Sequence, residues 1–326
     1  MPARPTRPRT DRARALLGVA RAVLSRALEA ALVVLATATI VFLVVRLLPG
    51  DPARLVLGDQ ASEAQLAALR AKLWLDRPLW LQYAHFLRGL VTLDFGESLR
   101  RPGVRAFSRV ALAAAPTSAL AGFAVGLGAA LGVASAVLAT GPWLGARRRH
   151  VERALVVVAA SPLLSFAPLV TWALAAKLRV VPLPGDPDAG AAALLFSGAL
   201  LAIPLAAQVG RVGHAALEEI ARAPFLSVAR AKGAGALRTW LVHAVPAASG
   251  PIVTVVATQL GALLGGAVVL ERLFERPGLG TLLMDAYATR DLPVLEATVV
   301  VAGALFVGVQ VLGALVHAAV DPRVRR

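Results

Sequence analysis

Residues 297–320 read ATVVVAGALFVGVQVLGALVHAAV, a stretch of 24 residues that contains no Asp, Glu, Lys or Arg. A bilayer core about 30 Å thick needs roughly 20 apolar residues at a helical rise of 1.5 Å per residue. The stretch is therefore long enough to cross a membrane as one α-helix. Five further charge-free runs precede it in the chain: 30–45, 110–146, 154–176, 189–210 and 239–270.

The six runs together predict an all-α integral membrane protein. The run at 110–146 has Pro116 near its start and Gly141-Pro142 near its end, so we expect one span there and not two. The first run reaches span length when residues beside it are added, because the charges of Glu29 and Arg46 lie near its ends and can snorkel to the interface. The six expected transmembrane helices are 27–48, 114–139, 154–177, 190–210, 248–270 and 296–318.

The composition excludes most other classes of protein. Hydrophobic residues make up 58% of the 326 residues and charged residues 16%, with a mean hydropathy of +0.71. Soluble domains are nearer 45–50% apolar and about 25% charged, so a soluble enzyme is excluded. The net charge of +15 does not indicate a nucleic-acid partner, because such proteins carry their charge on a water-facing surface.

The residues of chemically active sites are scarce. The chain has no Cys, its five His are far apart in sequence, and none of its three Lys stands in the G-K-[ST] context of a phosphate-binding loop. We therefore expect no catalytic residue, no metal site and no cofactor, and no ATP hydrolysis by this chain itself.

The arginines predict the orientation. If the N-terminus is cytoplasmic, the inner segments carry 19 Lys and Arg against five Asp and Glu, and the outer segments 14 against 12. The positive-inside rule then places both termini in the cytoplasm. The expected parts are a basic tail (1–26), the first helix (27–48), an extracytoplasmic region (49–110), a transmembrane domain (111–320) with a cytoplasmic loop at 211–247, and a C-terminal tail (321–326).

Two of the connecting segments have sequence patterns of their own. Residues 62–75 (SEAQLAALRAKLWL) begin with a Ser N-cap and a Glu placed for a capping box, and leucines recur at helical spacing. We expect a short amphipathic helix there, within a folded extracytoplasmic loop. In the loop 211–247, Pro224 should interrupt any helix and leave a separate short helix at Leu226–Lys232, ended by Gly233 and Gly235. A short basic helix between two spans is suited to docking another protein.

Three groups of motifs resemble a known family. After the first span come Leu48-Pro49-Gly50-Asp51-Pro52 and later Leu93-Asp94-Phe95-Gly96-Glu97-Ser98. The cytoplasmic loop contains Ala229-Arg230-Ala231-Lys232-Gly233, followed by His243 and Pro251-Ile252-Val253-Thr254. The last group is Gly265-Gly266-Ala267-Val268-Val269, Phe274, Pro277-Gly278-Leu279-Gly280, Arg290-Asp291 and Asp321-Pro322-Arg323. In this order the chain, from about Val33 to Arg325, resembles the permease subunits of bacterial ABC importers of the dipeptide, oligopeptide and nickel type.

The resemblance implies a multi-pass protein of the bacterial cell membrane that forms half of a translocation pore for peptides or a related small solute. Its implied partners are a second homologous permease, two P-loop ATPase subunits and an extracytoplasmic solute-binding protein. The resemblance also implies an ATPase-coupling loop whose helix moves when the ATPases close and rocks the pore between two states. The residues of that loop are Leu226, Ala229, Arg230, Ala231, Lys232 and Gly233.

Two other groups of residues remain open between a structural and a functional role. Pro277, Gly278 and Gly280 are either a tight turn between spans or part of an extracytoplasmic gate. Gln259, central in the fifth span, either lines the path or forms a hydrogen bond between helices. The chain also departs from the family pattern, because Pro224-Phe225 stands where an acidic-aromatic pair is usual, and Pro246 where Arg is more common.

Two functions of other classes were weighed against the importer. A stand-alone secondary transporter often has inverted repeats and charges inside the membrane, and neither is visible in this sequence. A membrane-embedded enzyme needs paired carboxylates, a His cluster or a nucleophile beside a base, and no such set occurs near one membrane face. The sequence does not identify the solute.

Overall fold

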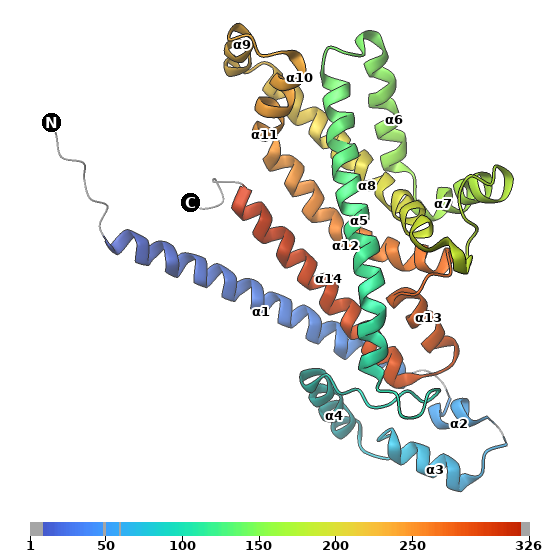
Figure 1. The fold of residues 1–326 in the computed structure, drawn as a ribbon. Helices are drawn as coiled ribbons and strands as arrows, with labels where there is room; N and C mark the ends of the chain where they lie inside the picture. Colours follow the sequence, from blue (N-terminus) through green and yellow to red (C-terminus); the bar gives the residue numbers. More distant parts are fainter. Residues whose placement is uncertain (1–8, 48–49, 59, 321–326) are drawn as a thin grey trace.

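The computed structural model describes residues 9–47, 50–58 and 60–320, and the regular structure within them is helical apart from one isolated β-bridge between Glu97 and Arg105. Figure 1 shows an elongated bundle with short helices gathered at its two ends. Residues 1–8 of the predicted basic tail, Leu48-Pro49 of the first motif and the predicted tail at 321–326 lie outside the described residues.

Five helices are long and apolar enough to cross a membrane. They confirm five of the six expected spans, and the run at 110–146 forms a single span, with Pro116 inside its helix. The helices are α1 (Arg9–Leu47), α5 (Ala106–Thr140), α8 (Gly190–Ala221), α12 (Ser249–Leu273) and α14 (Leu292–Val320).

The span expected over 154–177 is present as a bent pair of helices and not as one continuous helix. The chain forms α6 (Arg148–Ala160), then α7 (Leu163–Thr171) and the π-helical turn η2 (Trp172–Lys177), and the two halves meet at 108°. Ser161 between them is extended, with φ −83° and ψ 124°. The cause is Pro162, because a proline lacks the N–H that a helix needs and forces the preceding residue out of the helical region.

α8 is longer than expected, because it continues to Ala221 and not only to residue 210. It takes in the first part of the loop predicted at 211–247. The rest of that loop folds into α9 (Pro224–Ala231), α10 (Ala236–Arg238), the π-helical turn η4 (Thr239–Ala244) and α11 (Val245–Ala247). These elements lie together at one end of the bundle, beside the ends of α5 and α6 that face them (Figure 1).

The opposite end of the bundle carries the helices of the segment that follows α1. They are α2 (Pro52–Leu57), α3 (Glu63–Lys72) and α4 (Leu79–Thr92), and α13 (Leu279–Ala288) lies at the same end (Figure 1). The amphipathic helix predicted at 62–75 corresponds to α3. Its capping box is real, but the reciprocal partner of Ser62 is the amide of Gln65 and not a Glu, because Gln65 occupies the third helical position.

α5 and α8 form the centre of the bundle, and glycines allow their close approach. A Cβ on Gly128 would lie 3.0 Å from the carbonyl oxygen of Ala202, and one on Gly132 would lie 2.5 Å from Cβ of Val209. Small residues four apart on one helix are a common way to pack membrane helices without a hydrophobic driving force between them.

α1 lies at the side of the bundle and contacts α14 and α4. Phe42 packs against Phe86 and Val300 in a small buried cluster. One turn further along α1, Arg46 forms an ion pair with Glu296 and donates a hydrogen bond to Gln82. We expected Arg46 to snorkel to the interface at the end of its span. It instead pairs with Glu296, because α1, α4 and α14 bring the two side chains together away from water.

Candidate functional site

The end of the bundle that carries α9 contains the predicted coupling residues. Pro224 does not break α9 but begins it, because it stands in the first turn, where a missing N–H costs nothing. At the other end, Gly233 has φ +84°, its N–H donates to the carbonyl of Arg230, and the N–H of Ala234 donates to that of Ala229. This pair of bonds is a Schellman motif, so the prediction that Gly233 ends the helix is confirmed.

α9 has one buried face and one exposed face. Leu226 is only 1% exposed and belongs to the main hydrophobic core together with Leu217 of α8 and Ala244 of η4. Phe225 and Val228 are exposed at 45% and 53%. Helical spacing places Lys232 on the same outer side as these two side chains. The exposed surface of α9 is therefore an apolar pair beside a cation.

The predicted residues of the coupling loop are divided between these two faces of α9. Leu226 fixes α9 to the bundle, and Arg230 turns back on the helix, where its Nε donates to the carbonyl oxygen of Leu226 over 3.3 Å. Arg230 also lines a cavity of about 420 Å³ between α9 and the α5–α6 turn, together with Arg148, Thr140 and Trp240. Val228 was not singled out from the sequence, and Phe225 was named only in a departure from the family pattern. Their amphipathic spacing against Leu226 was the available signal.

A polar network joins α5, α6 and α8 next to this cavity. Oγ1 of Thr140 lies 2.8 Å from Nδ1 of His214, and Nε2 of that ring lies 3.5 Å from Oε1 of Glu152. Arg148 is 3.4 Å from both Glu152 and Glu218. These contacts are long for charge-assisted hydrogen bonds, and Glu218 is 43% exposed. The network therefore fixes the relative positions of the three helices only loosely.

At the opposite end, a buried carboxylate fixes the start of α13. Glu271, in the last turn of α12, is 1% exposed and accepts hydrogen bonds from Oγ1 of Thr117 at 2.6 Å and from the N–H of Gly280 at 2.8 Å. The same Thr117 hydroxyl oxygen accepts from the N–H of Leu279 at 2.9 Å. α5, α12 and α13 therefore meet at one carboxylate, which the sequence analysis did not identify as a candidate.

Two glycines of the predicted gate segment are required by these contacts. A Cβ on Gly278 would lie 2.1–2.3 Å from the carboxylate atoms of Glu271, and a Cβ on Gly280 would lie 2.6 Å from Cα of Val268. Both positions therefore exclude any side chain. Nearby, burial lowers the pKa of the Arg276 guanidinium, while the charge of Glu271 acts in the opposite direction.

A second buried carboxylate joins two motifs that are almost 200 positions apart in the sequence. Asp291, fully buried, accepts hydrogen bonds from the Ser98 hydroxyl and from the N–H of Leu99 at 3.0 Å, and lies 3.3 Å from Nη1 of Arg109. The segment Asp94–Ser98 and the pair Arg290-Asp291 therefore form one structural unit. This unit attaches the segment after α4 to the start of α14.

Gln259 lies on a cavity near the middle of the bundle. The cavity, of about 290 Å³, lies between α8, α12 and the break between α6 and α7, and both Pro162 and Pro204 line it. Gln259 is half-buried, and its amide makes no hydrogen bond with any residue that the structure describes. A polar side chain without a partner beside a broken helix is typical of a transport path.

The geometry defines a class of protein before any comparison. A bundle of apolar helices, with one bent pair of shorter helices and further short helices at both ends, is the architecture of a multi-pass membrane protein. Residues 143–326 match the family described as "Binding-protein-dependent transport system inner membrane component", and residues 19–100 match the N-terminal model of such components. The chain belongs to this family of transport permeases.

Similar curated proteins extend over almost the whole chain. The glutathione transport system permease protein GsiC of Salmonella choleraesuis (strain SC-B67) is 33% identical over 93% of this chain and 98% of its own length. GsiC of Pectobacterium atrosepticum is 35% identical over 88% of this chain and 92% of its own, and GsiC of Escherichia coli K12 is 33% identical over the same shares.

A solved structure shows the same fold. An inward-facing structure of the MetNI methionine ABC transporter has a TM-score of 0.53 and 19% identity, covering 65% of this chain and 96% of that one. The chain is therefore a transmembrane permease subunit of an ABC importer, a non-catalytic, multi-pass protein of the bacterial plasma membrane.

Proposed function

We propose that this permease forms one half of a translocation pore and that α9 is the helix through which a separate ATPase subunit drives it. The exposed Phe225 and Val228 on a helix fixed by buried Leu226 carry this proposal. An apolar pair at the tip of a loop has no partner within the described chain. An apolar cleft in an ATPase subunit would cover this pair, and Lys232 beside the pair favours acidic residues at the edge of that cleft.

The packing of α9 supports a role as a lever. Leu226 contacts the core cluster that contains Leu217 of α8 and Ala244 of η4. A displacement of α9 is therefore passed to α8 on one side and, through η4 and α11, to α12 on the other. α5 follows α8, because Gly128 and Gly132 bring the two helices into close contact. Such coupled rigid helices are the element that a partner can bias between two states.

The charge distribution supports an orientation with α9 in the cytoplasm. The α9 end of the bundle includes Arg147, Arg148 and Arg149, and the cytoplasmic segments of this orientation carry 19 Lys and Arg against five Asp and Glu. Residues 49–110 and α13 then face the outside, where the segment around Glu271 and Gly280 forms part of the gate. Gln259 lines the path between the two sides.

The remaining partners and the solute follow from the family. The second half of the pore is a homologous permease, two P-loop ATPases hydrolyse ATP, and an extracytoplasmic binding protein delivers the solute. Because the similar proteins are named as glutathione transport permeases, we assign a peptide or a related small solute to this importer. A stand-alone secondary transporter has no support in the comparisons.

The test uses two glycines of the α9 loop that differ in one respect. Gly233 has φ +84° and Gly235 has φ −63°, and a Cβ would meet no atom within 4 Å at either position. Gly233→Ala strains the backbone by about 1–2 kcal/mol at the end of α9, while Gly235→Ala introduces no strain. The measurements are co-purification of the ATPase subunits in detergent and solute-stimulated ATP hydrolysis in proteoliposomes.

We expect wild type and Gly235→Ala to retain the ATPases and to hydrolyse ATP at the same rate. Gly233→Ala should lower both readings several-fold, and Val228→Asp, which places a charge in the docking surface, should abolish them. A chain that purifies alone and transports solute without ATP would overturn the proposal.

A further inference from the structure

A small pocket lies between α4, the turn that follows α3 and the first turn of α14, apart from the cavities near α9 and Gln259. Its volume is about 120 Å³, enough for several waters and so for a small organic group. The floor contains Phe86 and Glu296, which are 5% and 8% exposed, whereas Trp74 at the mouth is 39% exposed. The pocket therefore opens outward from a buried acid.

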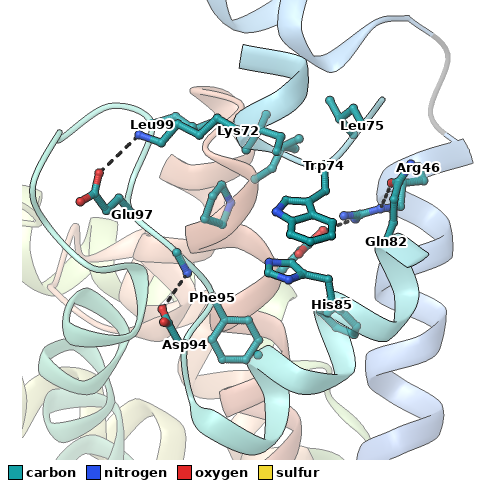
Figure 2. Close-up of a pocket in the computed structure, with 17 residues that line it drawn as sticks. Arg46, Lys72, Trp74, Leu75, Gln82, His85, Asp94, Phe95, Glu97 and Leu99 are labelled. Atoms are coloured by element: carbon teal, nitrogen blue, oxygen red, sulfur yellow. Dashed lines mark hydrogen bonds and ion pairs between the residues drawn. The ribbon is translucent and has the colours of Figure 1, made fainter. Parts of the chain in front are cut away.

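The side walls of the pocket are aromatic. The rings of Trp74 and His85 lie face to face (Figure 2), with their centres 4.3 Å apart and 11° between their planes. Phe95 lines the pocket from the loop after α4, and its ring packs edge-on against Phe86. Aromatic faces beside carboxylates are the usual environment for an ammonium or guanidinium group.

The charges that line the pocket leave one negative charge without a counterion. Arg46 pairs with Glu296 on the floor, and its Nε donates to Gln82 over 3.1 Å. Lys72 pairs with Glu97 at 3.3 Å at the mouth. The carboxylate of Asp94 forms no ion pair with any residue that the structure describes, and within that part of the chain it accepts a hydrogen bond only from the N–H of Gly96 (Figure 2).

The geometry of Glu296 adds a second acceptor. Only its Oε1 contacts Arg46, and the residue also lines the pocket, so one carboxylate oxygen remains for a ligand. Arg46 binds Glu296 and Gln82, its guanidinium lies 4.1 Å from the centre of the Phe42 ring, and the pocket lining as a whole has three carboxylates against two Arg and Lys side chains. The free capacity of the pocket is therefore for hydrogen-bond donors and positive charge.

We propose that this pocket binds an organic cation with a primary ammonium group, held by Asp94 and Glu296 and packed against the rings of Trp74 and Phe95. The proposal goes beyond the pore and the coupling helix and does not depend on either. The ammonium group has two sources, the amino terminus of a free solute or a lysine side chain of a docked protein. The same chemistry serves both.

The experiment uses the permease complex in nanodiscs and n-butylammonium as the probe, with n-butanol as a neutral molecule of the same shape. Binding is followed by the tryptophan fluorescence that is lost in Trp74→Phe. Asp94→Asn should weaken n-butylammonium binding at least five-fold. Lys72→Met should tighten it about two-fold, because it removes a positive charge from the mouth of the pocket. Asp285→Asn, an exposed change on α13 outside this pocket, should leave it unchanged.

Two further probes separate the sources of the ammonium group. Glycylglycine offers a free amino terminus, and Nα-acetyl-lysine methylamide offers only a side-chain ammonium. The probe that binds with the higher affinity indicates the natural source of the ammonium group. Equal binding of n-butylammonium and n-butanol, or weaker binding in Lys72→Met, would overturn the proposal. Loss of ATPase co-purification in the Gly233→Ala variant is a separate measurement, so a failure of the α9 proposal is not confused with a failure of this one.

Discussion

The α13 end and the α9 end of the bundle use acidic residues in opposite ways. At the α13 end, Glu271 and Asp291 are both fully enclosed. Glu271 accepts hydrogen bonds from Thr117 and Gly280 at 2.6 and 2.8 Å, and Asp291 accepts one from the N–H of Leu99 at 3.0 Å. At the α9 end, Glu152 and Glu218 have side chains that are 30% and 43% exposed, and Arg148 lies 3.4 Å from each of them.

This difference separates a permanent junction from an exchangeable one. A buried carboxylate that loses its donors costs several kcal/mol, so α5, α12 and α13 cannot part without a large penalty. Exposed ion pairs contribute about 0–1 kcal/mol each, so the contacts between α6 and α8 near α9 can change at little cost. Segments that move are drawn from the less stable parts of a protein. The α9 end fits that description.

The largest effect is expected from Glu271→Ala. It leaves the Thr117 hydroxyl and the Gly280 N–H without an acceptor in a buried site, which should lower stability by about 3–5 kcal/mol. Thermal unfolding of the purified protein in detergent measures the loss. Glu271→Gln retains one acceptor oxygen and should lose less than half as much. Glu219→Ala, an exposed change on α8, serves as the control. Equal unfolding temperatures for all three variants would contradict a permanent junction.

At the α9 end, one of two nearby residues should affect stability and the other should affect ATPase stimulation. Leu226→Ala removes a side chain that is 1% exposed and should cost about 2–4 kcal/mol. Val228→Ala removes one that is 53% exposed and should change stability by less than about 0.5 kcal/mol, yet lower ATPase stimulation several-fold. Paired unfolding and ATPase measurements decide this. If Val228→Ala destabilises the permease as much as Leu226→Ala, its side chain is part of the core and not a docking surface.

Much of this arrangement follows from the sequence because single residues determine it locally. Charge-free runs of span length predict five of the membrane helices, and Gly233 predicts the end of α9 because few other residues adopt φ +84°. Pro162 illustrates the limit of such reasoning. The sequence indicates a kink, but the 108° bend depends on what packs around the break.

The buried carboxylates could not be predicted because their partners are distant in sequence. Asp291 contacts Ser98, and Glu271 contacts Thr117, across 193 and 154 positions. A sequence pattern within one helix does not predict contacts with residues so far away in the sequence. The same holds for Arg46, which was expected to snorkel to the interface and which pairs instead with Glu296, 250 positions away in the sequence.

A smaller effect tests whether steric fit also holds α13. Gly280→Ala places a Cβ 2.6 Å from the backbone of Val268, and the overlap should cost about 1–3 kcal/mol. Gly265→Ala lies on the same helix as Val268, where a Cβ meets nothing within 4 Å, and should be neutral or stabilise by up to about 1 kcal/mol. We expect Gly280→Ala to lower the unfolding temperature and Gly265→Ala to leave it unchanged or raise it. Changes of the same sign in both variants would show that α13 is not tightly packed.

The smallest effect comes from an ion pair at the α13 end of the bundle that is not buried. Asp51 accepts a hydrogen bond from Nε of Arg70 at 2.9 Å, and both side chains are about one-third exposed. The hydrogen bond from Arg70 is the main cause that holds the pKa of Asp51 below its usual value. The pair therefore stabilises α2 and α3 above about pH 4, and this contribution is lost as the pH falls through the lowered pKa.

If burial and not location makes a junction permanent, Asp51→Asn should have only a small effect at pH 7. Hydrogen exchange in α2 and α3 should become slightly faster, corresponding to a loss of less than about 1 kcal/mol in local opening free energy. The difference from wild type should shrink as the pH falls below about 4 and Asp51 becomes protonated in the folded state. Glu63→Gln, at a side chain that is 76% exposed, should have less effect over the same range. A difference for Asp51→Asn that does not shrink with falling pH, or one as large as that of Glu271→Ala, would mean that location and not burial of the carboxylate makes a junction at this end permanent.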